Sequence, residues 1–494
     1  MIKKHIRLAT SWVLIMTILL FAVPVQVKAG ESQNINIEYL RAVMEMIKDN
    51  YHGDITDEEL ISGALKGMFN TMDAYTTYMS KDEAEEFLED ISGTYYGIGI
   101  TMKKNGNSIE VVKVFESSPA EKAGIYPGDR IAAVNGIKIA ETALDEINDL
   151  IRGPSGTDVT LEVVRGDSAT NIKVTRGKIE YNPVKYSIND GIGYIKLETF
   201  NANSSSAMEK ALKEMDKKRV KKIILDLRDN PGGEVDQAVA IAGMFVPKGL
   251  ITKLDFKSEN IQDVEYTSGL KRKKYELAVL VNSMSASASE IVAGAVQDRK
   301  AGVLVGTKTY GKAKVQRAIP LLTPEAFAKY KEMLGEDITS AYDLIYEHNI
   351  VPLFNEIIGY TKMTVGIYTT PNGRMIDSVG IEPDYYVEDP EQEGGIDIST
   401  LNKLSKTDKP SLGSEGADVY YAENILKLLG YDIDDPDSKY DEKTFEAVKQ
   451  FQKDKGGYSY GVLDYTTQQW LNEELDRLFL ELDKQYAKAV EVLK

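Results

Sequence analysis

Apolar residues recur at a spacing of three to four in two stretches near the start of the chain, "IEYLRAVMEMIKDNY" (37–51) and "EELISGALKGMFNTM" (58–72). This spacing places apolar side chains on one face of a helix and predicts a helical region over 34–92. Asp57 and Ser80 each precede an acidic turn, so both are expected to cap helices. The stretch "DAYTTYMS" that ends at Ser80 is expected to be a turn.

From residue 93 the pattern changes to short alternating strands, beginning with "GTYYGIGITMKKNGNSIEVVKVF" (93–115), which contains an Asn-Gly turn. An amphipathic helix is predicted around "ALDEINDLI" (143–151), and a further strand at "DVTLEVVRG" (158–166). The pattern therefore predicts one compact unit of strands with two helices over 93–166.

Residues 190–390 alternate between strand and helix patterns. The apolar strand "KKIILDLRD" (221–229) precedes a glycine-rich turn and a helix, and the strand "LAVLVN" (277–282) leads into a serine-rich turn and another helix. This alternation favours an α/β layer structure with a largely parallel sheet. A helical insertion rich in Lys, Glu and Tyr is expected over 322–360.

The last part of the chain is predicted to be helical. A polar, glycine- and proline-containing linker is expected over 401–415, followed by a small helical module over 416–473. Asp441 and Asp464 each stand three residues before a threonine at the start of an apolar-periodic helix, which indicates a weak pseudo-repeat. Residues 474–494 are expected to form an acidic-basic surface helix. The fold class is therefore multidomain α/β with a helical N-terminal region and a small all-α C-terminal domain.

Composition excludes several functions. The chain has 494 residues and a net charge of −18, so it lacks the basic surface that nucleic acid requires. It contains no cysteine, which rules out disulfides, thiolate metal sites and cysteine nucleophiles. It has only three histidines, none close to another in sequence, so a histidine-based triad or a histidine-rich metal site is not expected.

The N-terminus has the pattern of an export signal. Lys3, Lys4 and Arg7 precede the apolar run 12–23, and small residues end the segment 1–29. Cleavage is favoured because the apolar core is short, while an uncleaved membrane anchor remains the alternative. Either outcome places the rest of the protein outside the cytoplasm.

Candidate chemistry begins at "SMSASASEIVAG" (283–294), where serines precede a helix. With histidine scarce, a lysine is the natural base for an activated serine, and it must be desolvated to be neutral near pH 7. Lys312 follows an apolar strand, and alternation would place Gln316 on the same face as its orienting partner. Lys308 and Lys314 are the alternative candidates for the base, and both are expected to be solvated.

The glycine-rich turn in "DLRDNPGGEVDQAV" (226–239) allows a close backbone approach next to free amides at a helix start. This arrangement suits an oxyanion hole, although each of these short motifs taken alone is more often a simple connection.

Taken in order, Asp-Leu-Arg-x-Asn-Pro-Gly-Gly, Ser-Ala-Ser-Ala-Ser-Glu-Ile and Gly-Lys with a glutamine four residues on resemble the C-terminal processing peptidases, or tail-specific proteases, over about 34–390. The resemblance implies a catalytic set and oxyanion donors at these positions: Ser287 as nucleophile, Lys312 as base, Gln316 as support, and Gly232, Gly233 and Ala288 as donors. The chain departs from the family at Ala313, where a glycine is usual; alanine fits ordinary strand geometry, so activity is still expected.

The β-rich unit resembles a PDZ domain through "YYGIGI" (95–100) and "GDRI" (128–131). The resemblance implies that a terminal carboxylate binds the loop made by Tyr96, Gly97, Ile98, Gly99 and Ile100, while the bound peptide adds a strand beside it. The alternative is a plain β-sandwich fragment with a glycine-rich hairpin. The C-terminal module resembles a peptidoglycan-binding domain, and its alternative is a helical docking piece.

These observations define an expected domain scheme: signal peptide 1–29, helical region 30–92, PDZ domain 93–167, protease core 168–400 with its insertion 322–360, linker 401–415, peptidoglycan-binding-like domain 416–473 and C-terminal helix 474–494. The expected function is an exported serine endopeptidase that recognises C-terminal tails and uses a Ser-Lys dyad, with no cofactor or metal. Protein substrates with exposed tails are the expected partners, with peptidoglycan and a homodimer also open. The alternatives are a non-catalytic PDZ and cell-wall adaptor, and a peptidase acting on peptidoglycan stem peptides.

Overall fold

The structure is a computed structural model that describes residues 37–105, 108–115, 117–165, 168–259, 261–389, 396 and 398–494. The predicted signal peptide lies outside the described residues. The chain divides into two compact units, residues 1–67 and 68–494. Among the described residues, none of the helices combines the length and the apolar character needed to span a bilayer.

The first unit contains α2 (Ile37–Asn50) and most of α3 (Asp57–Asn70), as the periodicity predicted. The cap of α3 is Thr56, because its Oγ1 accepts a hydrogen bond from the Glu59 amide at 3.2 Å while the Glu59 carboxylate accepts one from the Thr56 amide at 2.7 Å. The expectation that Asp57 caps this helix was therefore wrong. Asp57 instead accepts a hydrogen bond from Lys48 at 2.7 Å.

The second unit begins with a short strand and a helix. Ser80 caps α4 (Lys81–Ser92) in a complete capping box, as predicted. The segment expected to be only a turn contains the strand β1 (Thr77–Met79), which pairs antiparallel with β18 (Ile357–Thr369). The pairing partner lies almost three hundred positions along the chain, so local pattern could not reveal this strand.

The β-rich unit has the predicted strands and helices around a buried core of Ile, Val and Leu side chains. Its sheet has the order β3-β4-β5-β7-β8, with β6 beside β5, and β2 pairs separately with β9. Asn135 and Gly136 both have positive φ in the tight turn between β5 and β6. The bounds are β2 (Thr94–Gly97), β3 (Ile100–Asn105), β4 (Ser108–Val114), α5 (Pro119–Lys122), β5 (Arg130–Val134), β6 (Ile137–Lys138), η1 (Ile139–Glu141), α6 (Leu144–Ile151), β7 (Asp158–Arg165), β8 (Ser168–Thr175) and β9 (Gly177–Glu180).

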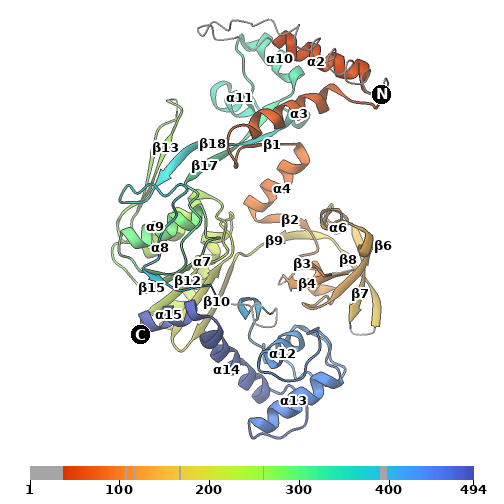
Figure 1. The fold of residues 1–494 in the computed structure, drawn as a ribbon, viewed down its shortest axis with the longest axis vertical. Helices are drawn as coiled ribbons and strands as arrows, with labels where there is room; N and C mark the ends of the chain where they lie inside the picture. Colours follow the sequence, from red (N-terminus) through yellow and green to blue (C-terminus); the bar gives the residue numbers. More distant parts are fainter. Residues whose placement is uncertain are drawn as a thin grey trace, which may run out of the picture. The chain divides into compact units, whose positions relative to one another are not determined.

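The core of the protease region is a sheet of order β10-β11-β12-β15-β16-β19, parallel from β11 onward, which confirms the predicted α/β class (Figure 1). Alternate residues of these strands face α7, α8 and α9 on one side, where the largest hydrophobic cluster lies. The bounds are β10 (Val184–Asn189), β11 (Ile192–Leu197), α7 (Ser204–Lys217), β12 (Lys222–Asp226), α8 (Val235–Phe245), β15 (Glu276–Val281), α9 (Ala288–Asp298), β16 (Val303–Gly306) and β19 (Tyr385–Tyr386).

A second sheet, entirely antiparallel, has the order β1-β18-β13-β14, with β17 beside β18. The strand-helix alternation did not predict this sheet, because its strands come from distant parts of the chain. Its remaining strands are β13 (Gly249–Phe256), β14 (Val264–Ser268) and β17 (Lys314–Leu322). The insertion is helical as predicted, with α10 (Pro324–Leu334), α11 (Ala341–His348) and η2 (Phe354–Glu356) around a small core of their own.

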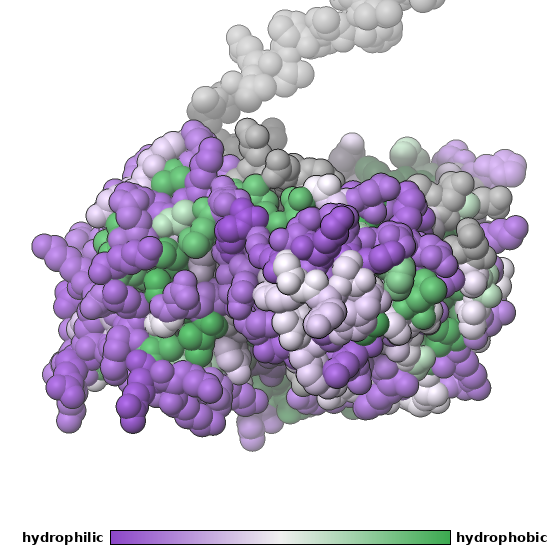
Figure 2. Space-filling model, turned by 90° about the horizontal axis from the view of Figure 1, so that it is seen from below, coloured by the Kyte–Doolittle hydropathy of each residue, from purple (hydrophilic) through white to green (hydrophobic). Residues whose placement is uncertain are grey.

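The C-terminal module consists of α12 (Ala417–Leu428), α13 (Glu442–Asp454) and α14 (Tyr465–Leu482). Asp441 and Asp464 accept hydrogen bonds from the amides of Thr444 and Thr467, so the two capped starts of the pseudo-repeat are present. The segment expected to be a linker carries Leu404, which is buried in the core of this module. The face drawn in Figure 2 is largely hydrophilic with separate apolar patches, as the charged composition of the chain requires.

The last helix, α15 (Lys484–Leu493), covers the face of the parallel sheet opposite α7, α8 and α9 (Figure 1). The expectation of a surface helix was wrong. A parallel sheet needs both faces covered, and α15 supplies the second cover with buried residues from one side of the helix: Gln485, Tyr486, Ala489, Val490 and Leu493.

Candidate active site

The serine-rich turn places each of its serines differently. Ser283 is exposed, whereas Ser285 is buried and donates to the Leu227 carbonyl at 2.8 Å, so Ser285 has a structural role. Ser289 is also buried and donates to the Asn230 carbonyl at 2.9 Å, so it ties α9 to the glycine-rich turn. Ser287 remains half-buried at the N-cap of α9.

The backbone of Ser287 is strained, with φ 55° and ψ −112°. A non-glycine residue rarely adopts this conformation, which costs of order 1–3 kcal/mol and persists only where the surroundings enforce it. Such strain at a serine that begins a buried helix indicates a functional turn that presents a side chain.

Glu290, in the first turn of α9, is the group that enforces this turn. Its carboxylate is fully buried and accepts hydrogen bonds from the Ser287 amide at 2.9 Å and from the Lys312 amide at 2.9 Å. It also accepts from the Gly311 amide at 2.8 Å and from Thr309 Oγ1 at 2.7 Å. One carboxylate therefore holds the serine turn and the lysine loop together.

Two further contacts bring the same segments together. The Tyr368 hydroxyl lies 2.9 Å from the Ser287 carbonyl oxygen and 2.8 Å from the Lys312 carbonyl oxygen. The glycine-rich turn approaches from another direction, because a Cβ on Gly232 would lie 2.8 Å from Ser287 Cβ. The three motifs recognised in the sequence therefore meet at one place.

Lys312 has a partly buried side chain whose Nζ lies 3.1 Å from Gln316 Oε1 and 4.6 Å from the centre of the Tyr75 ring. Gln316 Nε2 donates to the Tyr75 carbonyl at 2.6 Å, which fixes the amide with its oxygen toward the lysine. Burial, reinforced by the positive charge of Lys362, lowers the pKa of Lys312, although Asp73 acts in the opposite direction. This lysine is therefore easier to deprotonate than a solvated one.

The competing lysines have carboxylate partners. Lys308 Nζ lies 3.2 Å from Glu382, and Lys314 Nζ lies 3.0 Å from Asp377. The predicted strict alternation from Lys312 to Gln316 does not hold, because β17 begins at Lys314 and its register shifts between Val315 and Gln316. The bulge nevertheless leaves Gln316 within hydrogen-bond reach of Lys312.

Within the described residues, no hydrogen bond joins Ser287 Oγ to Lys312 Nζ; the partner of Nζ is Gln316. Catalytic hydrogen bonds are often long in free enzymes and shorten when substrate binds.

Ala313 is the position at which the chain departs from the family motif. Its side chain is fully buried, its φ lies outside the left-handed region, and its amide donates to Asp377 Oδ1 at 3.1 Å. Alanine therefore fits the local backbone, as expected.

Of the three amides expected to bind the oxyanion, one already donates a hydrogen bond within the protein and two do not. The Gly232 amide donates to Asn230 Oδ1 at 2.9 Å and is used within the turn. In the described part of the chain, the amides of Gly233 and Ala288 donate to no other residue. A Cβ on Gly232 would also lie 3.0 Å from the Ala288 nitrogen, so the turn and the helix start are in close contact.

The expected carboxylate loop lines a pocket of about 480 Å³ beside β3 and α6. Gly97, Ile98, Gly99 and Ile100 line it, together with Tyr95 rather than the exposed Tyr96, because neighbours in a strand point to opposite faces. The amides of Ile98 and Gly99 donate to no other described residue. A peptide with a terminal carboxylate would find donors there.

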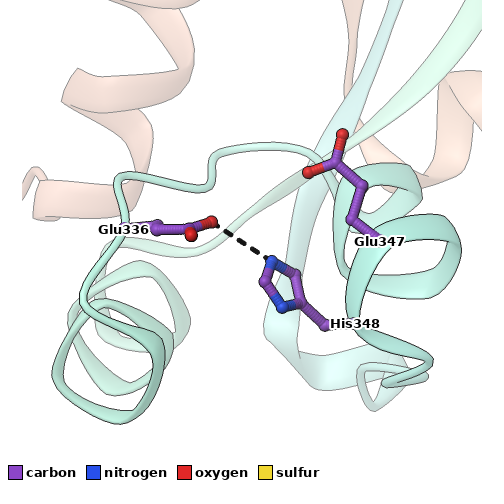
Figure 3. A group of neighbouring side chains, drawn as sticks. All are labelled: Glu336, Glu347 and His348. Carbon is purple, nitrogen blue, oxygen red and sulfur yellow. Dashed lines mark ion pairs between the residues drawn. The ribbon is translucent and has the colours of Figure 1, made fainter.

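The insertion contains one group of potential metal ligands, Glu336, Glu347 and His348 (Figure 3). His348 is the last residue of α11, and its Nε2 lies 3.3 Å from a Glu336 carboxylate oxygen. Both glutamates are exposed, as is common for acidic side chains that hold no metal ion. We assign the contact between Glu336 and His348 as a structural link between the segment after α10 and the last residue of α11.

We expect the Lys362→Gln substitution to shift the acid limb of the kcat/KM profile to higher pH. Lys362 opposes protonation of Lys312, so its removal raises the pKa of Lys312 and reduces the neutral fraction at a given pH. Activity at neutral pH should fall about two- to five-fold, the range of a single partly screened charge. Lys362→Arg keeps the charge and should keep the profile; the same shift in both variants would contradict the charge effect.

Sequence reasoning missed four residues of this site: Asp73, Tyr75, Glu290 and Tyr368. Tyr75 and Asp73 stand in the "DAYTTYMS" segment, for which the pattern predicts only a turn, and Glu290 stands in the serine motif, where the sequence indicates no role for it. Tyr368 had no local signal.

A serine at a strained helix start, joined through one buried carboxylate to the loop of a partly buried lysine, is an arrangement that suits a serine peptidase. A model of "Peptidase family S41" matches residues 191–387, and a PDZ domain model matches 97–175. A "Putative peptidoglycan binding domain" matches 415–471, and an "Activating protease CtpB N-terminal domain" matches 22–83.

The carboxy-terminal processing protease CtpA of Bacillus subtilis is 33% identical over 479 residues, which cover 94% of this chain and 92% of that protein. A "Probable CtpA-like serine protease" of Staphylococcus saprophyticus is 31% identical over 450 residues, 90% of this chain and 83% of that protein. Among solved structures, a photosystem II D1 C-terminal processing protease covers 71% of this chain and 92% of its own, with 23% identity and a TM-score of 0.39.

The chain belongs to the S41 family of serine peptidases, as a CtpA-like C-terminal processing protease with a PDZ domain and a domain of the peptidoglycan-binding type. This confirms the family and the enzyme class that the sequence motifs predicted.

Proposed function

We propose that this protein is an exported endopeptidase that recognises proteins by their C-terminal tails and cleaves them with a Ser287–Lys312 dyad. The observation that carries the proposal is the double attachment of Ser287 and Lys312 to one buried carboxylate, Glu290. The lowered pKa of Lys312 supports the base assignment.

In the proposed mechanism, neutral Lys312 accepts the proton of Ser287 Oγ as the oxygen attacks the scissile carbonyl carbon. Gln316, fixed by the Tyr75 carbonyl, orients the lysine amine. The carbonyl oxygen becomes an oxyanion and accepts hydrogen bonds from the unengaged amides of Gly233 and Ala288. Protonated Lys312 then donates to the departing amine, and the acyl-enzyme remains.

Deacylation repeats the sequence with water. Lys312, neutral again, accepts a proton from the attacking water molecule, and the second tetrahedral intermediate collapses with return of the proton to Ser287 Oγ. The products are a shortened protein with a new carboxylate and the released C-terminal fragment. No group outside the chain and the water molecule is required.

Substrate selection is assigned to the PDZ pocket. A substrate tail would lie beside β3 as an added strand, with its terminal carboxylate at the amides of Ile98 and Gly99. In this proposal the hydrogen bond between Ser287 Oγ and Lys312 Nζ forms when the substrate segment enters the site.

The test is cleavage of an unfolded protein that carries an apolar C-terminal tail with either a free carboxylate or a carboxamide. We expect the wild type to cleave the carboxylate form about ten-fold more efficiently or better, because hydrogen bonds to a charged acceptor contribute about 1.5–3 kcal/mol. Gly99→Ala should remove the preference, since its Cβ would lie 2.5 Å from Ser118 Cβ. Ser287→Ala is the inactive control; equal cleavage of both tails would contradict tail recognition.

We also propose a location at the cell wall, supported by the peptidoglycan-binding type of the C-terminal domain and by the export pattern of residues 1–29. Co-sedimentation of the intact protein with purified sacculi is the expected result. Failure to co-sediment would favour a role of this domain within the protein itself.

A further inference from the structure

The PDZ domain and the C-terminal module share a buried polar contact. Asp129 is fully buried, and its carboxylate binds the Arg165 guanidinium at 2.6 and 2.8 Å within the PDZ domain. The same carboxylate accepts a hydrogen bond from Ser438 Oγ of the C-terminal module at 2.9 Å, and Ser438 is fully buried as well. The contact therefore excludes water at its centre.

Arg165 extends this contact with its remaining nitrogen. Its Nη1 lies 2.5 Å from the Glu415 carboxylate, which belongs to the segment leading into α12. At the rim, Arg130 and Asp435 form a more exposed ion pair at 3.2 Å. The exposed pair at the rim contributes little to the stability of the contact. Truncating one partner in the buried network is costly, because it leaves the other charge buried and unpaired.

The backbones also approach closely at Gly128. Its φ is +87°, and a Cβ there would lie 2.6 Å from Tyr420 Cδ2 and 3.1 Å from Asp437 Cα. Only glycine allows the module to pack this tightly against the turn. Charge, burial and steric fit thus come together on one small surface of the PDZ domain.

The other end of the module is attached to the protease core. The buried residue Asp483 is both the C-cap of α14 and the N-cap of α15. Asp483 lies 3.0 Å from Arg228 Nη1 and 2.8 Å from Nη2, and Arg228 also binds Asp226 at the end of β12. With α15 packed under the parallel sheet, this end of the module cannot move without opening the core.

We propose that the C-terminal module is a strut that holds the PDZ domain at a set position relative to the protease core. The module reaches the PDZ domain through Ser438 and Glu415 and reaches the core through Asp483 and α15. Its partner surface is the turn of Gly128 and Asp129 together with Arg165. This role adds to any binding of peptidoglycan by the module.

A strut has a kinetic consequence, which rests on the proposed tail recognition. A tail bound to a PDZ domain that is held in place presents the scissile segment to Ser287 at a high effective concentration. When the PDZ domain swings freely, this effective concentration falls. Cleavage of tailed proteins should therefore weaken, while cleavage of a short peptide without a PDZ-binding tail should not change.

The test uses spin labels on cysteines introduced at Lys138 in the PDZ domain and Lys271 in the core, both exposed, in a chain with no cysteine of its own. Gly128→Ala adds the methyl group that would meet Tyr420. Gly136→Ala is the matched control, because Gly136 has φ +81° and nothing within 4 Å of its Cβ position. Both substitutions carry the same backbone strain, and only the first meets the module.

We expect a narrow distance distribution in the wild type and Gly136→Ala, and a broad one in Gly128→Ala and in the independent variant Glu415→Gln/Ser438→Ala. In the two broadened variants, kcat/KM for the tailed protein should fall about ten-fold, and kcat/KM for the short peptide should stay within two-fold. An unchanged distribution in both variants overturns the strut. A broad distribution with unchanged cleavage of the tailed protein overturns its part in delivery.

A failure of the proposed function would give a different result from a failure of the strut. If Ser287→Ala cleaved like the wild type, the dyad would be wrong while the distance measurement would keep its meaning.

Discussion

Replacing Lys312 by methionine should lower kcat for cleavage of a tailed protein by about 10²- to 10⁴-fold, the contribution of a positioned general base. Methionine fills a similar volume without an amine, so the packing over Tyr75 is largely kept. The reaction of Ser287 with a fluorophosphonate should slow in parallel, because that reaction also needs the deprotonated serine.

Lys308→Met is the matched control for this prediction. Lys308 stands four positions earlier, is about half exposed and pairs with Glu382, so its loss should leave kcat within about two-fold, as exposed ion pairs contribute little. Thermal unfolding of both variants checks that they fold. If Lys312→Met keeps kcat within ten-fold of the wild type, another group must be the base.

Glu290→Gln should lower kcat by about a hundred-fold with a smaller change in KM. Each oxygen of this carboxylate accepts two hydrogen bonds, one pair from Thr309 and Gly311 and the other from Ser287 and Lys312. Whichever way a glutamine amide turns, its NH2 group faces two donors, and unsatisfied buried donors cost about 1–3 kcal/mol each. The turn and the lysine loop should separate, and a displacement of about 1 Å suffices for such a loss.

Glu423→Gln is the matched control, since Glu423 is another buried glutamate of the chain. Burial raises the pKa of Glu423 to about 9, so this side chain is protonated at neutral pH and glutamine closely imitates it. Activity and thermal stability should stay near the wild type in Glu423→Gln. Equal losses in both variants would indicate a general cost of altering buried glutamates and would contradict the positioning role of Glu290.

Features that depend on contacts between residues close in sequence could be predicted, whereas features that depend on distant residues could not. Ser80, Asp441 and Asp464 cap their helices as predicted, because a cap is a contact across three residues. Thr56 replaced Asp57 as a cap, a shift of one position that acidic composition alone could not resolve. The antiparallel sheet with β1 and β18 was missed, because its pairs are distant in sequence.

The candidate site shows the same division. The proposed nucleophile, base and supporting amide stand in contiguous motifs, and the structure brings these motifs together. Tyr75 could not be assigned from the sequence, because its carbonyl meets Gln316 across 241 positions. The buried face of α15 was also hidden, because its pattern is as compatible with a surface helix as with one that covers a sheet.

By itself, the sequence determined the protease class and the candidates Ser287 and Lys312, because the motifs that resemble the peptidase family are contiguous and because the chain has only three histidines and no cysteine. Only the tertiary structure decided that Glu290 and Tyr368 hold these two residues together and that the C-terminal module meets both the PDZ domain and the core. The physical reason is that hydrogen bonds and buried contacts between distant segments depend on where the chain returns in space, which no local periodicity records.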